Sequence, residues 1–159
     1  MTRIIGIDPG KTGAIASLWS IGGASVEDLP VISDRSLDWI DGGALQTLLM
    51  GRGLNIDTTV VIERVSAMPK QGVSSSFKFG MVFGSILSVI QAVGYPIEFV
   101  TPAVWKRDLG LSSEKKAALH KARLLFPNCD LRLKKHDGRA EALLIAHWFH
   151  VTHTLRAAA

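Results

Sequence analysis

The chain has 159 residues and a mass of 17.2 kDa; 47% of its residues are hydrophobic and 20% are charged. These values suit one domain with a sizeable core and exclude both a disordered polar chain and a pair of full catalytic domains. The single cysteine, Cys129, cannot form an internal disulfide or a zinc cluster, and no signal segment precedes the acidic Asp8. We therefore expect a cytoplasmic protein.

Positive charge gathers in the C-terminal part of the chain. Residues 1–99 carry 7 Lys and Arg against 9 Asp and Glu, whereas residues 100–159 carry 11 against 5. This excess favours a polyanionic partner, and nucleic acid suits it better than a membrane surface because no basic amphipathic helix stands out. A solvated basic face without a partner explains the charge equally well.

The first third of the chain predicts a hairpin and then a helix. Residues 3–8 form a nearly continuous apolar run, which is typical of a strand buried on both faces. A turn at residues 9–13 leads to a returning strand at 14–19, and a third strand is expected near 24–29. Apolar side chains at helical spacing predict a helix over residues 37–49.

The rest of the chain alternates strands and helices. Strands are predicted at residues 58–63 and 97–100, separated by a loop at 66–76 and a helix that begins at Ser74 or Ser75 and ends near residue 93. Further helices are predicted from Pro102, from Ser112 or Ser113 to Pro127, and from Asp137 to about His150. This order predicts one α/β domain over residues 1–159, with a central mixed sheet that opens with an antiparallel hairpin and is flanked by helices.

Carboxylates stand where burial makes them unfavourable. Asp8 and Glu63 each end a buried strand, while Asp137 and Glu141 open an otherwise apolar helix and share one of its faces. A hard divalent cation relieves such crowding, and two Mg²⁺ ions about 3.5–4 Å apart are the usual clamp for phosphodiester hydrolysis.

Each acidic residue also has a structural explanation. Asp8 before Pro9 suits a turn, and Glu63 can pair with a neighbouring base. Asp137 is a good N-cap, and Glu141 suits the dipole of a helix start. The four together, with a basic C-terminal part, favour a catalytic site.

Four blocks of the sequence resemble RuvC-type Holliday junction resolvases of the RNase H-like superfamily. The resemblance covers nearly the whole chain and lies in the hairpin GIDPGKTG (6–13), the strand VIERV (61–65), the basic segments TPAVWK (101–106) and SEKK (113–116), and the helix DGRAEALLIA (137–146). It implies an RNase H-like fold and a crossover junction endonuclease that cuts four-way DNA junctions by paired symmetric nicks, as a homodimer. It also implies four catalytic and metal-binding carboxylates, matched here by Asp8, Glu63, Asp137 and Glu141, with two Mg²⁺ ions per site and Mn²⁺ as a substitute.

The spacing of the last two acidic residues departs from that of familiar bacterial members. Those members place them three apart, whereas Asp137 and Glu141 are four apart and residue 138 is glycine. Four-apart spacing resembles organellar and phage-like relatives. His136 precedes this pair; it belongs either to a basic run that contacts DNA or, as in some relatives, to the metal site.

Basic and aromatic residues around these blocks are the candidates for DNA contact. Lysines and arginines position phosphates, and an exposed ring such as Phe77 can stack on an unpaired base, although a place in the core is an equally good account of Phe77. The candidates are Lys11, Lys70, Gln71, Phe77, Lys78, Lys106, Arg107, Lys115, Lys116, Lys134, Lys135, His136 and Arg139.

Small residues recur every fourth position from Gly80 to Ala92, which lets another element approach the helix closely. That element is either the domain's own sheet or the same helix of a second subunit, and a two-fold junction favours a two-fold homodimer. The apolar stretch at residues 79–93 is shorter than the ~20 residues of a membrane span, so no membrane is expected, nor is any small-molecule cofactor beyond the metal.

Two other functions remain open on the sequence. The same fold can cut an RNA–DNA hybrid or other branched DNA, and a non-catalytic module can bind branched DNA without cleaving it. The hairpin at residues 8–13 also resembles the phosphate loop of actin and sugar kinases, but that reading needs two such domains, which 159 residues do not supply.

Overall fold

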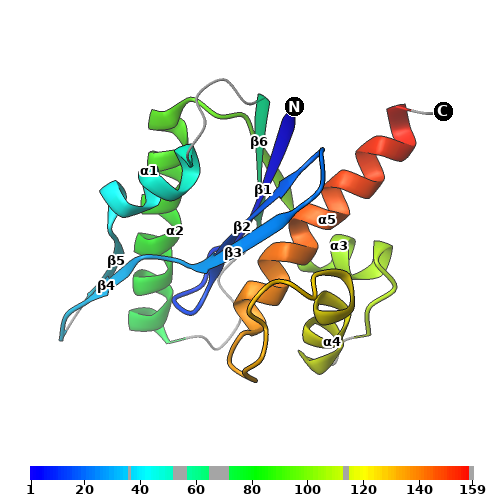
Figure 1. Ribbon diagram of the computed structural model, residues 1–159. Helices are drawn as coiled ribbons and strands as arrows, with labels where there is room; N and C mark the ends of the chain where they lie inside the picture. Colours follow the sequence, from blue (N-terminus) through cyan, green and yellow to red (C-terminus); the bar gives the residue numbers. More distant parts are fainter. Residues whose placement is uncertain (36, 52–56, 65–71, 113–114, 158–159) are drawn as a thin grey trace.

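The computed structural model describes residues 1–35, 37–51, 57–64, 72–112 and 115–157. Its elements lie in the order expected of an α/β chain that opens with a hairpin (Figure 1). They are β1 (Thr2–Asp8), β2 (Ala14–Trp19), β3 (Ala24–Asp28), β4 (Val31–Ser33), β5 (Asp38–Ile40), α1 (Gly42–Met50), β6 (Asp57–Glu63), α2 (Val73–Val93), β7 (Ile97–Val100), α3 (Pro102–Asp108), α4 (Lys115–Leu125) and α5 (Asp137–Ala157).

The main sheet has five strands in the order β3-β2-β1-β6-β7. Strands β1, β2 and β3 pair antiparallel as two consecutive hairpins, whereas β6 and β7 run parallel to β1. The mixed sheet and its opening hairpin are therefore confirmed. The strands predicted from the apolar runs all form, with ends within one residue of the predicted positions.

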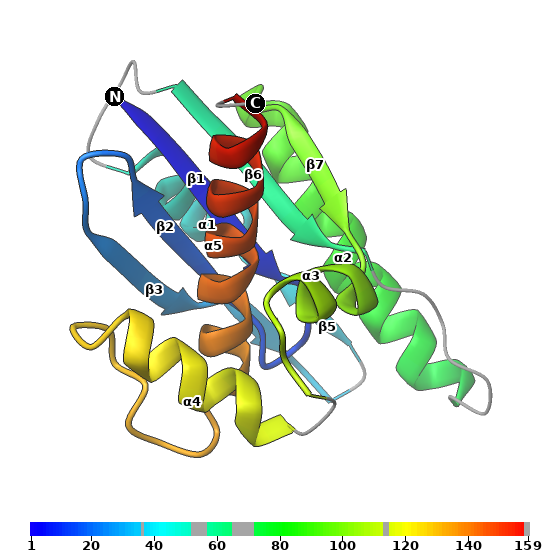
Figure 2. The same ribbon diagram turned by 90° about the vertical axis from the view of Figure 1, so that its right-hand side faces the viewer.

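Helices cover both faces of this sheet, so each face carries its own core. Helices α1 and α2 pack on one face, and α5 with α3 and α4 on the other (Figures 1 and 2). Alternate residues of β1 serve the two cores: Ile5 and Ile7 face α1 and α2, while Gly6 lies under α5. A side chain at Gly6 would meet the backbone of Ala142 and Ala146, so glycine here allows α5 to cross the sheet closely.

The predicted helix over residues 37–49 is wrong in its first part. Asp41 is the N-cap of α1 and its carboxylate accepts a hydrogen bond from the Ala44 N–H, so the helix begins only at Gly42. Residues 38–40 instead form β5, which pairs antiparallel with β4 in a small second sheet. The side chains of Asp38 and Ile40 are buried on one face of β5, and this period of two defines a strand.

Helix α2 begins earlier than predicted, at Val73 after the N-cap Gly72, and the predicted serine cap is wrong because those serines lie within the helix. It has 21 residues, an 18-residue window of which has a mean hydropathy of 1.5, so it is long and apolar enough to cross a membrane, although the core helix of a soluble protein passes the same test. The apolar stretch at residues 79–93 was judged too short for a membrane span, and the full length of α2 does not support that argument. Only 17% of the apolar window is buried within the fold.

Candidate metal and nucleic-acid site

Two of the predicted carboxylates meet at one edge of the sheet. Asp8 ends β1 and Glu63 ends β6, and these strands pair in parallel with Ile7 opposite Ile62. The next residue of each strand is an acid, so both side chains leave the sheet at the same edge. Glu63 is only 6% exposed, which is rare for an ionisable side chain without a compensating partner.

Helix α5 brings a third carboxylate to this edge. Its N-terminal turns pack against the Asp8 hairpin because residue 138 is glycine: an added Cβ there would lie 3.0 Å from the Asp8 Oδ2 and would meet the Thr12 carbonyl oxygen. The Glu141 side chain lies one turn further along. Carboxylate oxygens of Asp8, Glu63 and Glu141 all lie within 4.8 Å of one another.

Crowding these acids makes the site electrostatically unfavourable without a cation. Burial, together with the neighbouring Glu141 and Glu63, raises the pKa of Asp8 to about 7, although the Gly10 N–H and the Lys106 ammonium oppose this. Burial likewise raises the pKa of Glu63 above its usual range. Oxygen ligands so arranged suit a hard divalent cation, which replaces mutual repulsion by attraction.

Helix α3 supplies two hydrogen-bond donors to the carboxylates. The fully buried Trp105 donates its indole N–H to the Glu63 Oε1 at 2.8 Å. The Lys106 Nζ donates to the Glu141 Oε1, also at 2.8 Å, and lies 4.9 Å from the centre of the Trp105 ring. Sequence analysis missed the contact of Trp105. The signal was present, because a buried indole N–H nearly always finds a partner and Glu63 was predicted to be buried.

The fourth predicted carboxylate lies apart from these three. Asp137 is the first residue of α5, is exposed, and is not among the acids grouped within 4.8 Å in the described part of the chain. It borders a basic cavity of about 510 Å³ whose other lining residues are Lys116, Leu119, His120, Arg123 and Lys134. Residue 138, three positions before Glu141, is the position next to Asp8, and as a glycine it has no side chain there.

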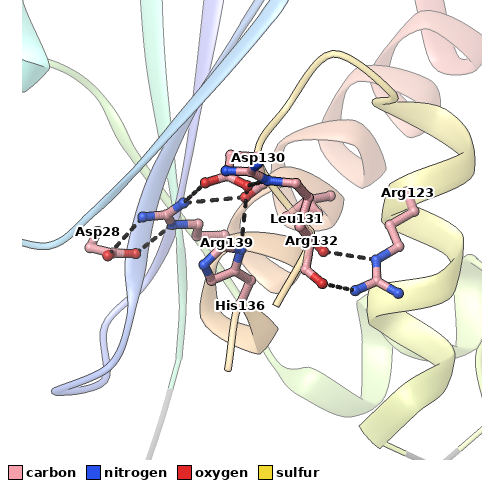
Figure 3. Close-up of polar contacts among 7 residues, drawn as sticks. All are labelled: Asp28, Arg123, Asp130, Leu131, Arg132, His136 and Arg139. Carbon is pink, nitrogen blue, oxygen red and sulfur yellow. Dashed lines mark hydrogen bonds and ion pairs between the residues drawn. The ribbon is translucent and has the colours of Figure 1, made fainter. Parts of the chain in front are cut away.

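Arg139 and His136 lie in a charge cluster on the neighbouring surface of α5 (Figure 3). The Arg139 guanidinium binds both oxygens of Asp28, at 2.6 and 2.9 Å, and an Asp130 oxygen at 3.2 Å. His136 is 5% exposed, with its Nδ1 4.0 Å from Asp130. Both residues were predicted to contact DNA, and His136 alternatively to join the metal site. In the structure their side chains connect β3, α5 and the 126–136 segment, while the contact with DNA stays a prediction.

The other predicted DNA contacts fall into three groups. Some are tied to acids: Lys11 and Lys78 to Asp38, Lys106 to Glu141, and the 74% exposed Arg107 to its neighbour Asp108. Others are exposed: Phe77, Lys116, Lys134 and Lys135. Lys115 begins α4, whereas Lys70 and Gln71 lie outside the described residues.

One known protein resembles part of the chain in sequence. No family profile matches the chain. Over 91 residues the chain is 37% identical to the chloroplastic Holliday junction resolvase MOC1 of Chlamydomonas reinhardtii. This stretch is 55% of the chain but only 10% of that relative.

Two solved structures share the whole fold. Thermus thermophilus RuvC in complex with a Holliday junction substrate superposes with a TM-score of 0.64 at 17% identity, over 98% of this chain and 96% of that one. A second Thermus thermophilus RuvC structure gives 0.59 at 18% identity, over 96% and 98%. The strand order, the α5 crossing and these superpositions together establish that the chain has the RNase H-like fold of RuvC-type proteins.

Proposed function

We propose that the chain is a metal-dependent endonuclease that resolves four-way DNA junctions by paired nicks, and that residues 1–159 form one nuclease domain. The observation that carries this proposal is the convergence of Asp8, Glu63 and Glu141 at the sheet edge of a RuvC-type fold. The partial relative, which is named as a Holliday junction resolvase, supports the same substrate.

Asp8, Glu63 and Glu141 would hold the metal, with Asp137 as a fourth carboxylate from the same helix. The donor set fits Mg²⁺, with Mn²⁺ as a substitute, because all three grouped ligands are carboxylate oxygens. Burial and the two neighbouring carboxylates raise the pKa of Asp8, and a bound cation would offset this unfavourable negative charge. When bound, two such ions supply an activated water and stabilise the leaving oxygen of a phosphodiester.

The chain's own residues prepare this site for DNA. Trp105 holds Glu63 in one orientation through its 2.8 Å hydrogen bond, so the carboxylate need not reorganise when a cation arrives. Lys106 offsets part of the negative charge that would otherwise repel a phosphate.

Exposed Lys116, Lys134 and Lys135 extend the positive surface beyond the carboxylates, and Phe77, 60% exposed at the start of α2, is free to stack on a base.

A second copy of the chain would cover α2. The fold buries Val82, Ile86 and Ile90 of this helix, whereas Gly80 and Gly84 are exposed, and an added Cβ on either would meet nothing within 4 Å. The small residues therefore face away from the domain's own sheet. A junction has two strands to nick symmetrically, so a two-fold dimer through this face places two sites on one substrate. A monomeric mass by light scattering at micromolar concentration would contradict it.

One assay separates the candidate substrates. A labelled synthetic four-way junction, a matched duplex and an RNA–DNA hybrid are incubated with the protein, with Mg²⁺ and with chelator. We expect symmetric nicks in the junction only, and only with Mg²⁺. Preferred cleavage of the hybrid would make the protein a hybrid nuclease, and binding of the junction without cleavage would make it a branched-DNA binding module.

The cytoplasmic location and the absence of a membrane partner stay predictions. The partial relative is chloroplastic, and α2 passes the length and composition test for a membrane span. Dimerisation through α2 would bury the exposed apolar face of this helix against the second copy of the chain.

A further inference from the structure

A second buried carboxylate lies outside the metal site. Asp38, on β5, has a side chain that is only 5% exposed. The ammonium of Lys11 lies 3.0 Å from one of its oxygens and that of Lys78 lies 3.9 Å from the other. A hydrogen bond from the Ser33 hydroxyl and the contact with Lys11 hold the pKa of Asp38 below its usual range.

This carboxylate joins three parts of the molecule. Lys11 belongs to the loop that follows Asp8, Lys78 lies in the second turn of α2, and β5 packs against α2. Asp38 is thus the common anchor of two lysines that are 67 positions apart in the sequence. Together with Ser75, Phe79 and Val82 the three residues line a small cavity of about 190 Å³.

Within the described part of the chain, the two lysines keep donors for another anion. An ammonium has three N–H donors, and among the described residues each lysine makes one ionic contact, with Asp38. The Lys11 side chain is 60% exposed and that of Lys78 is 31% exposed, whereas Asp38 is too buried to repel a ligand directly. Two positive charges share one negative charge, so the surface stays cationic.

We propose that Asp38 is a positioning residue that holds Lys11 and Lys78 together as a clamp for a backbone phosphate of the DNA substrate. The clamp lies beside the loop of Asp8, so it fixes the strand that enters the carboxylate site. This inference rests on the proposed nuclease function. Its physical basis is preorganisation: a lysine already held in place loses less conformational freedom on binding than a free one.

The clamp predicts a change in DNA affinity opposite to the one expected from net charge alone. Removal of a negative charge near DNA should tighten binding, whereas removal of the anchor should weaken it. We expect Asp38→Asn to weaken binding of a four-way junction in chelator by roughly twofold to tenfold for each lysine released. Glu27→Gln removes the same charge from exposed β3 and should leave the affinity unchanged or slightly increased.

The salt dependence of binding tests the two lysines directly. Lys11→Met and Lys78→Met should each reduce the slope of log affinity against log salt by about 0.9, the value for one phosphate contact. When the Asp38→Asn substitution is already present, each lysine substitution should reduce the salt slope by less, because residues of one clamp are coupled. Asp38→Glu keeps the charge and should restore part of the affinity; it replaces Asp38→Asn if that variant does not fold.

Two results would overturn the clamp. One is junction binding by Asp38→Asn as tight as by Glu27→Gln, which would mean that the lysines only neutralise a buried acid. The other is an unchanged salt slope in both lysine variants. In either case the wild type would still bind and cut junctions, so the proposed function would stand. A wild type that neither binds nor cuts them would overturn both.

Discussion

The first turns of α5 carry two charged clusters that are built in opposite ways. On one side, Glu141 joins Asp8 and Glu63, and burial together with the two neighbouring carboxylates raises the pKa of Asp8 to about 7. On the other side, Arg139 joins Asp28 and Asp130, and hydrogen bonds from Arg132, with the Arg132 charge, lower the pKa of Asp130 to about 2 (Figure 3).

The difference lies in the supply of positive charge. Each acid of the Arg139 cluster has a guanidinium within hydrogen-bond distance, so the cluster is complete and holds the fold together. Among the described residues, the acidic cluster has one ammonium, Lys106, for three carboxylates. A deficit of positive charge in a partly buried site marks the place where a cation is expected to bind.

The largest effect should follow from removing one carboxylate of the acidic cluster. We expect Asp8→Asn to reduce junction cleavage on the order of 10³-fold or more, because members of a catalytic unit are not interchangeable, while junction binding persists. In chelator the variant should melt at a higher temperature than the wild type, because repulsion is relieved. A lower melting temperature with cleavage retained would make Asp8 a structural turn residue.

The burial of Asp8 and its two neighbouring carboxylates also predict how the stability of the metal-free protein depends on pH. The pKa of Asp8 is about 7 in the folded state against 3.8 in the unfolded state, so between these values the folded state binds more protons. The free energy of unfolding therefore falls as pH rises from about 4 to 7, by on the order of 4 kcal/mol in total. Thermal melts in chelator from pH 5 to pH 8 should show this decline, and Asp8→Asn should flatten it. An equally steep decline in the variant would show that a group other than Asp8 causes the pH dependence of stability.

Removal of the Trp105 hydrogen-bond donor should lower the affinity of the site for Mg²⁺ without abolishing metal binding. Trp105→Phe keeps a buried ring but leaves Glu63 without its 2.8 Å hydrogen bond. We expect the Mg²⁺ concentration for half-maximal cleavage to rise roughly 10–100-fold, as for other residues that orient metal ligands. Trp148→Phe is the matched control, because its indole donates to Asp108 outside the acidic cluster. A similar shift in both variants would show a general loss of packing.

The smallest effects, on the free energy of unfolding, should follow from substitutions at Arg139, in the cluster whose acids each have a guanidinium partner, and at exposed Arg107. Arg139→Met leaves Asp28 and Asp130 without this partner and should lower the free energy of unfolding by about 1–2 kcal/mol. The salt slope of junction binding should not change, since the guanidinium is already occupied. Arg107→Met, at a 74% exposed site, should stay within about 0.5 kcal/mol of the wild type. A salt slope reduced by about 0.9 in Arg139→Met would show that Arg139 contacts a DNA phosphate.

Local pattern was sufficient for most elements of this fold. The apolar runs at β1, β2 and β6 predicted their strands, because a strand buried on both faces has few polar positions. The short strand β7 was also predicted, although two of its four residues are exposed. The pattern failed at residues 37–41, where three strand residues and an N-cap were read as the start of a helix. Pairing with β4 decides that segment, and no window of sequence shows which partner a short strand will find.

The sequence by itself determined that acids end two buried strands, and the parallel register then required Asp8 and Glu63 to meet. Only the tertiary structure decided which residue of the α5 start would join them. Glycine at position 138 lets the helix approach so closely that Glu141 joins the group and Asp137 stays outside it. The partners of Trp105, Asp38 and Arg139 were likewise undetermined, because a contact across 27 to 111 positions depends on how separate elements pack.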